Sequence, residues 1–551
     1  MSKPETDYEM QHGETADTTA ANADPGNKPS VAKSTLLMSV ATLASRVTGL
    51  ARTWAMAFAL GNTVITSAYQ VANNMPNMIY DLVAGGLLNA AFIPLYLLQV
   101  ETQGKEGGDR FGSNLLNIVI IIMGALSLAG AIFAPELIST QTFTVESSSE
   151  VFGYAVFFFR IFAFQMLFYG LCGVVTSILN AHRVYFLPSL APAFNNIVTI
   201  ASFICYIPLY NINPTIALTV LAVGTTLGVV VQLVVQIPAL IRMGFKYVLK
   251  INFRDPAFIE TVKVGIPMVV YILGTLVAFT CRNAFSLQTG DNGPSTLLYA
   301  WTWFQLPYGI IAVSLSRALF TEMSDAMASG DKAKFNRHLS MGLSTTLLLI
   351  IPLAGLMCVL AGPIMQIFRA GAFNASDVQY VGYILSLWVL VLPSYAIQMY
   401  LFNVYAAIRR FTRFAVVCVI LCAVQCAMYA LLCNQGALGL AGVPAADFIY
   451  YTVTSIILLI ILKRSIGHIG AGHAISVGVR ALLATAIGAG LAAVALYFLP
   501  LGSGILGGVL AVVIYGGVGL IIIFALCRLF RIPETDAALG VIGRIRKRFS
   551  R

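Results

Sequence analysis

The chain has 551 residues, of which 58% are hydrophobic and only 10% are charged. An ordinary soluble domain is excluded, because such a domain needs more polar side chains to cover its surface. The formal net charge of +10 does not indicate nucleic-acid binding, since the basic residues stand in short loops between apolar stretches and in the C-terminal tail.

Residues 1–33 differ from the rest of the chain, because they are polar and show no apolar periodicity. No apolar segment of the kind found in a signal peptide stands near the start. We therefore predict that residues 1–33 form a disordered cytoplasmic tail.

Long apolar stretches separated by short loops fill the chain from Ser34 to Phe530. A hydrocarbon core of about 30 Å requires roughly 20 apolar residues per helical span. The sequence therefore predicts an all-α polytopic membrane protein with fourteen transmembrane helices. The predicted spans are 34–60, 63–100, 112–138, 150–181, 186–210, 215–242, 256–288, 294–328, 335–361, 377–408, 412–433, 441–463, 473–499 and 503–530.

The lysines and arginines between these spans fall almost wholly on one side of the predicted membrane. If the N-terminus is cytoplasmic, the even-numbered spans end in the cytoplasm, and most of the 33 basic residues lie there. Such an asymmetry is typical of cytoplasmic loops. We therefore expect both termini in the cytoplasm, with the basic tail 531–551 against anionic lipid headgroups.

Two short motifs recur at nearly the same separation along the chain. Pro76 in the second predicted span is matched by Pro307 in the eighth, and the basic turn at Arg183 is matched by the turn at Arg409. This repeat predicts two six-helix lobes related by pseudo-two-fold symmetry about an axis along the membrane normal. The predicted units are an N-lobe (34–243), a C-lobe (256–466) and two appended helices (471–530).

Charged residues inside the predicted spans are the strongest functional signal. A central arginine costs about 2.5–3.5 kcal/mol on insertion scales, so it is usually paired or faces a watery cavity. Arg46 and Arg52 lie on the first span, and Asp81 lies on the second at a depth similar to that of Arg46. Two interpretations stay open for Arg46, namely a structural ion pair with Asp81 and an anion-binding role.

Arg282 on the seventh span is the third internal arginine. Under the repeat it occupies the place that Arg52 has in the first lobe. Two arginines that face each other across the lobe interface would bind an anion, whereas the alternative is that Arg282 extends outward to the external interface. Because acids are scarce inside the spans, the balance of charge favours an anionic substrate.

No catalytic motif stands out, since Walker A, His-Glu-x-x-His and nucleophile-elbow patterns are all absent. Cys418, Cys422 and Cys426 recur at helical spacing, but no His, Asp or Glu accompanies them on that span. We predict that they are packing residues and not metal ligands. We expect a transporter driven by the membrane potential or an ion gradient, with no enzymatic activity, cofactor or metal.

Several motifs, taken in their order along the chain, resemble those of the MurJ (MviN) family. They are SRVTGLAR at 45–52, MPN at 75–77, GGLLNAAFIP at 85–94, FLPSLAPAFNN at 186–196 and LPYGI at 306–310. The resemblance covers about residues 34–530 and extends to the count of fourteen helices. It implies a transporter of the multidrug/oligosaccharidyl-lipid/polysaccharide flippase superfamily in the bacterial cell (cytoplasmic) membrane.

Members of this family move lipid II, the undecaprenyl-diphosphate-linked peptidoglycan precursor, from the inner to the outer leaflet for cell-wall synthesis. The resemblance therefore implies lipid II or a similar polyprenyl diphosphate as substrate, membrane lipids as further partners, and alternating access as the mechanism. It also implies that residues 471–530 form a groove for the lipid tail. It leaves the coupling ion open.

The family's two first-helix arginines match Arg46 and Arg52. Its other charged site residues are replaced here by uncharged side chains, at or near Tyr80, Thr302 and Gln305. Arg282 is therefore expected to substitute for part of the missing positive charge. The predicted substrate-binding residues are Arg46, Arg52, Arg282, Ser45 and Asp81.

Three alternatives stay open at this point. The first is a flippase for another polyprenyl-linked oligosaccharide, and the second is a cation-coupled multidrug antiporter of the same superfamily. Such antiporters normally have twelve spans and bind cations with acidic side chains, so the cationic spans and the two extra helices argue against them. The third, a scaffold for cell-wall enzymes that transports nothing, predicts that the internal arginines can be lost without consequence.

Overall fold

The computed structural model describes residues 31–80, 92–249, 251–254, 256–434, 436–467 and 469–536. Within these ranges the chain forms helices and no β-strand. Asp81 and residues 85–91 of the GGLLNAAFIP motif lie outside the described ranges. The prediction of an all-helical chain is confirmed for the part that the structure describes.

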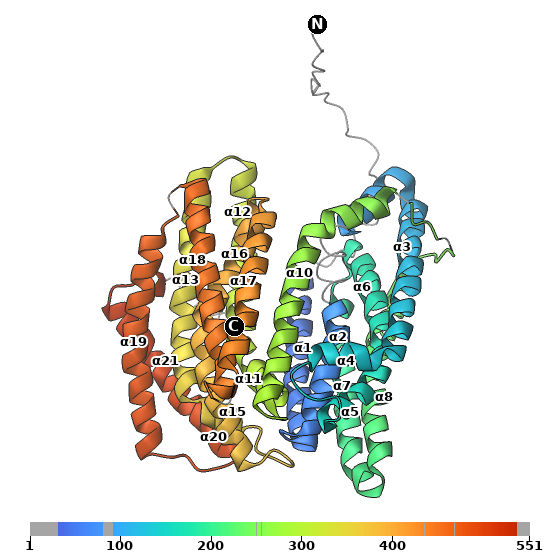
Figure 1. The fold of residues 1–551 in the computed structure, drawn as a ribbon. Coiled ribbons are helices and arrows are strands. Elements are labelled where there is room, and N and C mark those ends of the chain that lie inside the picture. The colour runs from blue at the N-terminus through green and yellow to red at the C-terminus, as the bar shows by residue number, and fades with distance from the viewer. Residues whose placement is uncertain are drawn as a thin grey trace.

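The first half of the chain contains nine helices among its described residues. They are α1 (Val31–Leu60), α2 (Val64–Tyr80), α3 (Ile93–Ile132), α4 (Ala134–Gln141), α5 (Glu150–Phe162), α6 (Gln165–Ala181), α7 (Phe186–Ile212), α8 (Pro214–Val234) and α9 (Ile237–Arg242). We call α1–α9 the N-terminal helix group. Figure 1 shows this group on one side of the molecule.

The second half begins with α10 (Pro256–Thr289), which lies between the two sides in Figure 1. We call the elements that follow α10 the C-terminal helix group. They are α11 (Gly293–Pro307), the π-helix η2 (Tyr308–Ala312), α12 (Val313–Ala328), α13 (Lys332–Val359), α14 (Ala361–Gln366), α15 (Ala375–Trp388), η3 (Val389–Val391), α16 (Leu392–Ala407), α17 (Phe411–Leu432), η4 (Gly439–Ala441), α18 (Gly442–Ile466), α19 (Ala471–Phe498), α20 (Ile505–Ala511), η5 (Val512–Gly516) and α21 (Gly517–Leu529).

Each predicted span overlaps one helix or one interrupted series of helices. Ten of the described helices are long and apolar enough to cross a membrane, or eleven if the bent pair α5–α6 counts as one span. The helices α1 and α2 and the series α11–η2–α12 are not among them. The chain is therefore a multi-pass membrane protein, and the count of fourteen spans stays a prediction.

Three local features differ from the predicted boundaries. Residues 93–100, predicted to end the second span, belong to α3, which continues through the predicted loop and is interrupted only at Gly104, where φ is 69°. The fourth span is bent by 44° between α5 and α6. The eighth is interrupted by η2 directly after Pro307, since proline cannot donate a helix hydrogen bond and the backbone adjusts by a π-turn.

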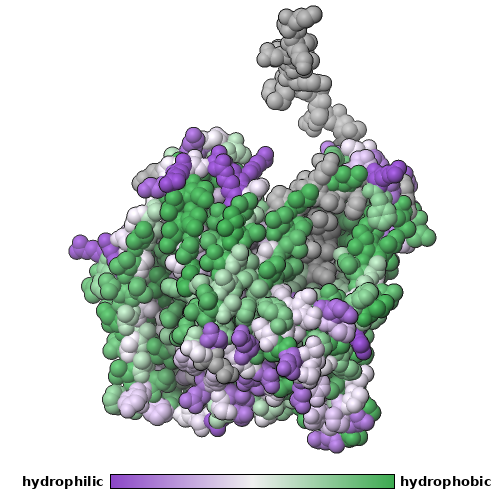
Figure 2. Space-filling model, in the orientation of Figure 1, coloured by the Kyte–Doolittle hydropathy of each residue, from purple (hydrophilic) through white to green (hydrophobic). Residues whose placement is uncertain are grey.

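Exposed apolar side chains cover much of the molecule. Figure 2 shows hydrophobic residues over most of the middle of this face, on helices of both groups, and hydrophilic residues along the upper rim. Among the exposed large residues are Leu482 and Leu483 on α19 and Ile521 on α21, each more than half exposed. A protein in water would bury such surfaces, so they are expected to face lipid.

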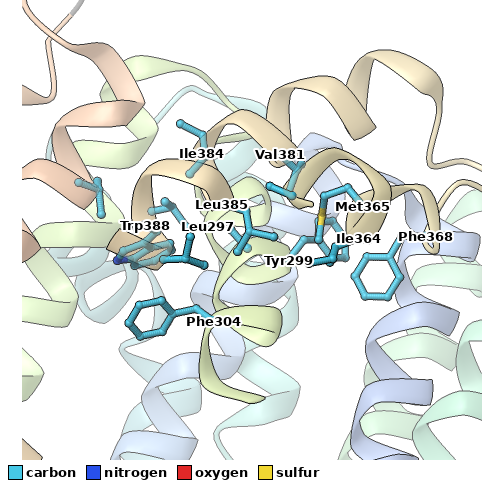
Figure 3. Packing of buried hydrophobic residues seen from close by; sticks show 14 of the residues in the cluster. Leu297, Tyr299, Phe304, Ile364, Met365, Phe368, Val381, Ile384, Leu385 and Trp388 are labelled. Carbon is cyan, nitrogen blue, oxygen red and sulfur yellow. The ribbon is translucent and has the colours of Figure 1, made fainter. Parts of the chain in front are cut away.

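Large aromatic and aliphatic side chains form the core of the C-terminal group. Figure 3 shows Leu297, Tyr299 and Phe304 of α11 against residues of α14 and α15. The Phe304 ring lies 5.9 Å from that of Trp388 on α15, and both side chains are fully buried. Because buried aromatic side chains contribute large apolar areas, this packing fixes α11 on the C-terminal group.

The linker between α9 and α10 is bound along α3 by polar side chains. Its backbone N–H groups at Lys246, Val248 and Asn252 donate to Asp109, Ser113 and Asn114 of α3 at 3.2, 3.0 and 2.7 Å, in that order. The side-chain amides of Asn114 and Asn117 donate back to linker carbonyls at 3.1 Å each. The polar stripe on α3 therefore fixes the start of α10 to the N-terminal helix group.

Candidate functional site

Arg46 lies near the middle of α1 and its side chain is exposed. Its guanidinium carbon lies 3.9 Å from the point where a Cβ atom on Gly309 would stand. Gly309 belongs to η2 of the C-terminal group, so Arg46 extends from one helix group to the other. The π-helix after Pro307, in the LPYGI motif, is the element that faces this charge.

Ser45, the neighbour of Arg46, contributes its backbone and not its hydroxyl group to the contacts of α1. Its carbonyl oxygen accepts from the side-chain amide of Asn196 on α7 at 3.3 Å, and Thr48 Oγ1 accepts from the same amide at 3.1 Å. The preceding residue, Asn195, donates to Gln232 of α8 at 2.9 Å. The two asparagines of the FLPSLAPAFNN motif therefore hold α1, α7 and α8 together beside Arg46.

Arg52 faces the interior of the N-terminal helix group. Its charge interacts with the phenol groups of Tyr69 on α2 and Tyr169 on α6. The Tyr69 hydroxyl also lies 3.1 Å from Thr225 Oγ1 on α8. Arg52 thus lies near the hydroxyl groups of two other helices, α2 and α6.

Arg282 on α10 lies in an aromatic environment in the second half of the molecule. Its guanidinium carbon is 4.1 Å from the centre of the Phe279 ring, 5.2 Å from that of Trp301 and 5.5 Å from that of Trp388. The residue is only 9% exposed, and it lines a cavity of about 310 Å³ between α10, α11, α16, α17 and α18. We call this the aromatic cavity.

Asp447 on α18 lines the same cavity and is 1% exposed. Its Oδ2 accepts from the indole N–H of Trp388 at 2.8 Å, and its Oδ1 accepts from the Gln425 amide at 2.8 Å and from the Tyr429 hydroxyl. Three donors from α15 and α17 therefore bind one buried carboxylate. Such donors stabilise the ionised form of a carboxyl group.

The structure does not bring the predicted site residues together in one contact. Arg46 faces η2, Arg52 faces its own helix group, and Arg282 faces the aromatic cavity. Within the described ranges no acid lies within 4 Å of any of the three guanidinium groups. Asp81, the predicted partner of Arg46, lies outside those ranges.

The cysteines of α17 belong to the helix packing. Cys418 and Cys422 are buried, Cys426 is half-buried, and the Cys422 thiol donates to the Gly274 carbonyl at 2.9 Å. In the part of the chain that the structure covers, no group of three or more His, Cys, Asp or Glu side chains could hold a metal ion.

A polar seam joins the two helix groups at the end of the molecule where α1 finishes. We define it by Asn62, Ser67, Ser295, Thr296 and Tyr299. The Asn62 amide donates to Thr296 at 2.9 Å, the Ser67 and Ser295 hydroxyls lie 3.2 Å apart, and the Tyr299 hydroxyl donates to the Gly61 carbonyl at 2.8 Å. All five residues are buried, so the seam closes this end.

Two further contacts extend this closure. The amide of Gln141, the last residue of α4, donates to Thr280 of α10 at 2.9 Å, and the indole of Trp54 on α1 donates to the Ile367 carbonyl at 3.0 Å. Gly61 has φ 66°, and a Cβ there would lie 2.5 Å from the Ala372 carbonyl oxygen, so only glycine fits. These hydrogen bonds all lie at the end of the molecule where α1 finishes.

Sequence reasoning identified the arginines, with Ser45 and Asp81 beside Arg46, but gave no role to the residues that surround Arg282. Asp447 carries no signal of its own in the sequence, because nothing near it along the chain links it to Trp388 or Arg282. Asn195 and Asn196 contributed to the family resemblance, and two adjacent amides within an apolar stretch were the signal that could have marked them as interhelical contacts. The seam residues are common small polar side chains with no signal of their own.

Comparison with known proteins gives the chain its family. The family model described as lipid II flippase MurJ matches residues 56–510. The probable lipid II flippase MurJ of Bdellovibrio bacteriovorus is 27% identical over 534 residues, which cover 90% of this chain and 95% of that protein. The corresponding protein of Rhizobium meliloti is 26% identical over 363 residues, covering 65% of this chain and 67% of its own length.

Solved structures agree with this. A lipid II flippase MurJ in an inward closed conformation superposes with a TM-score of 0.73 at 25% identity, and the match covers 91% of this chain and all of that one. An inward-facing multidrug transporter of the MATE family shares the fold, with a TM-score of 0.60 at 15% identity over 79% of this chain and 94% of its own. The chain belongs to the lipid II flippase MurJ family.

Proposed function

We propose that this protein moves lipid II from the inner to the outer leaflet of the cytoplasmic membrane by alternating access. The observation that carries the proposal is Arg46, an exposed guanidinium on α1 that lies against η2 of the other helix group. A guanidinium presents paired N–H donors to phosphate oxygens, and a diphosphate offers several such acceptors. Membership of the MurJ family supplies the class of substrate.

We assign the diphosphate contact first to Arg46, with Ser45 beside it. Arg52 and Arg282 add positive charge on either side of the interface, and Asp81 is the counter-charge of Arg46 in the absence of substrate. In this scheme the two helix groups move relative to each other, so that the arginines approach one substrate only in part of the cycle. The aromatic rings near Arg282 and the tyrosines near Arg52 keep both charges stable in the meantime.

The scheme uses fourteen spans in two related lobes, residues 34–243 and 256–466, with residues 471–530 as a groove for the lipid tail. Both termini are cytoplasmic, so the polar seam lies at the external end. Its hydrogen bonds agree with a state closed to the outside. Outward opening would then require that the contacts of Asn62, Ser67 and Tyr299 with α11 and the end of α1 break.

The membrane potential is the driving force in this proposal. Moving one charge across 100 mV changes the free energy by about 2.3 kcal/mol, so a diphosphate with two charges would gain about 4.6 kcal/mol on its way outward. The orientation is favourable because the cell interior is negative. In this proposal the free energy from the membrane potential drives transport without a coupling ion.

Complementation tests the proposed function most directly. We expect the wild-type chain to support growth of a bacterium depleted of its own lipid II flippase, and the triple variant Arg46→Ala/Arg52→Ala/Arg282→Ala to fail at equal membrane abundance. Arg160→Ala, which removes another exposed arginine on α5, is the matched control and should complement. Growth with the triple variant would favour the scaffold, and failure of the wild type together with export of cationic drugs would favour the antiporter.

A further inference from the structure

The guanidinium of Arg282 has donors that no described side chain uses. Its Nε is inaccessible and has no hydrogen-bond partner in the described part of the chain, and no acid there lies within 4 Å. The three aromatic rings around it attract the charge but accept no conventional hydrogen bond. A buried cation with free donors calls for an acceptor in the space that it faces.

Asp447 is the charged group that interacts with Arg282 across that space. Both residues line the aromatic cavity, where burial disfavours the ionised form of Asp447 and the positive charge of Arg282 offsets part of that cost. Trp388 lies between them, since its N–H donates to Asp447 and its ring lies 5.5 Å from the guanidinium carbon. The two charges therefore balance each other without a direct hydrogen bond.

This separation leaves room for a ligand. The cavity has a volume of about 310 Å³. One water molecule takes up about 30 Å³, so the cavity has room for the few heavy atoms of a phosphate group. The three donors that bind the Asp447 carboxylate are already in use. The Nε donor of Arg282 is not in use, because no described side chain accepts from it. An acceptor group that enters the cavity would thus find its donors on Arg282.

We propose that Asp447 is the internal counter-ion of Arg282 and that it sets how tightly Arg282 holds a phosphate group of the substrate. The inference rests on the proposed function and adds a residue that acts through Arg282. A phosphate that binds Arg282 competes with the attraction from Asp447. The competition keeps binding weak enough for release, so Asp447 is a positioning residue that favours turnover over retention.

Kinetics in proteoliposomes test this directly. We expect Asp447→Asn to lower KM for lipid II about 10-fold and to lower kcat as well, because the substrate then leaves more slowly. Asp325→Asn is the matched control, since it makes the same substitution at an exposed acid on α12 that does not line the cavity. It should leave KM within about two-fold. The double variant Arg282→Gln/Asp447→Asn should lose the lower KM.

An unchanged or higher KM in Asp447→Asn, or an equal fall of KM in Asp325→Asn, would overturn the inference. Inorganic pyrophosphate added on the cytoplasmic side distinguishes the sources of the phosphate. If Asp447→Asn binds lipid II more tightly but is not more sensitive to pyrophosphate, the cavity takes only the lipid's diphosphate. If Asp447→Asn binds lipid II more tightly and is also inhibited more strongly by pyrophosphate, the cavity accepts diphosphate in general. Either result supports the counter-ion role of Asp447.

Thermal unfolding provides a readout that does not depend on transport. Asp447→Asn leaves the charge of Arg282 unbalanced, so the unfolding temperature of this variant should lie below that of the wild type. The double variant Arg282→Gln/Asp447→Asn should recover part of that loss. A midpoint of the double variant at or below that of Asp447→Asn would overturn the pairing. If the wild type moved no lipid II, the proposed function would be wrong. The unfolding temperatures would still test whether Arg282 and Asp447 balance each other.

Discussion

The internal arginines of this chain differ in what offsets their charge. Arg282 has three aromatic rings and a carboxylate across a cavity, and Arg52 has the phenol groups of Tyr69 and Tyr169. Arg46 is exposed and lies beside a glycine of the opposite helix group. Of the three, Arg46 is therefore the most readily accessible to a ligand.

Substitution of Arg46 should weaken substrate binding more than it affects folding. We expect Arg46→Ala to lose a charge-assisted contact of about 1.5–3 kcal/mol, or roughly 10- to 150-fold in affinity for lipid II. Arg46→Lys should recover only part of this, because lysine lacks the paired donors. Binding to purified protein measures the effect, with Arg160→Ala as control. Equal affinity of Arg46→Ala and the wild type would contradict the assignment.

His182, directly after α6, predicts a pH dependence. Its Nε2 lies 3.0 Å from the Tyr96 hydroxyl, and burial lowers the pKa of His182 from 6.5, with Lys105 lowering it further and Asp109 opposing. The unfolded chain therefore binds the proton more readily, and the stability that the neutral ring contributes is lost as pH falls below about 6.5. Between pH 7.5 and 5.5 the unfolding midpoint should fall more in the wild type than in His182→Gln. Parallel pH profiles would contradict this.

At the scale of elements, the sequence predicts where helices form, but it does not predict where they bend or continue through a loop. Runs of about 20 apolar residues predict spans well, because lipid forces every backbone group to be satisfied within the helix. The bend between α5 and α6 and the continuation of α3 through the predicted loop depend on tertiary contacts. Gly104 is the one visible sign, since its positive φ permits two helical pieces to join there.

The candidate site shows the same division. A charge in an apolar span costs free energy wherever it lies, so Arg46, Arg52 and Arg282 were recognisable from the sequence alone. Their surroundings were not, because Trp388 and Asp447 approach Arg282 from helices far along the chain. For Arg282 the sequence left two interpretations, namely a position facing Arg52 across the interface and an outward extension, and neither pointed to the aromatic cavity that Arg282 lines.

The α9–α10 linker is the element whose attachment can be tested separately. Replacing Asn114 and Asn117 of α3 by alanine should free the linker, since each lost hydrogen bond costs about 0.5–1.5 kcal/mol. Amide exchange at Val248 and Asn252 should then speed up roughly 2- to 10-fold, as hydrogen exchange would report. Thr102→Ala is the control on α3, because its hydroxyl bonds only the Leu98 carbonyl of its own helix. Unchanged exchange would show that other contacts hold the linker.

At the scale of the whole molecule, the side to which this state is closed depends on which end of the membrane the polar seam occupies. From the loop charges we predict that the α10–α11 loop lies outside and the α12–α13 loop inside. We expect a cysteine at Asp291 to react with an impermeant reagent from outside, and a cysteine at Lys334 to react only after the membrane is opened. Because the native cysteines could react as well, the unsubstituted chain is the control. Labelling of both positions from one face would reverse or refute the topology.

If the seam is the external gate, locking it should stop transport in a reversible way. Ser67 on α2 and Ser295 on α11 have hydroxyl oxygens 3.2 Å apart, so the sulfur atoms of cysteines at both positions would lie close to each other. We expect oxidised Ser67→Cys/Ser295→Cys protein to lose lipid II transport and to regain it on reduction. The two single variants, oxidised in the same way, control for the native cysteines. The bond would hold α2 and α11 together, so the outward-open state could not form while the inward side remained accessible to substrate. Full transport by the cross-linked protein would mean that the two helix groups open elsewhere and that the seam is a permanent brace.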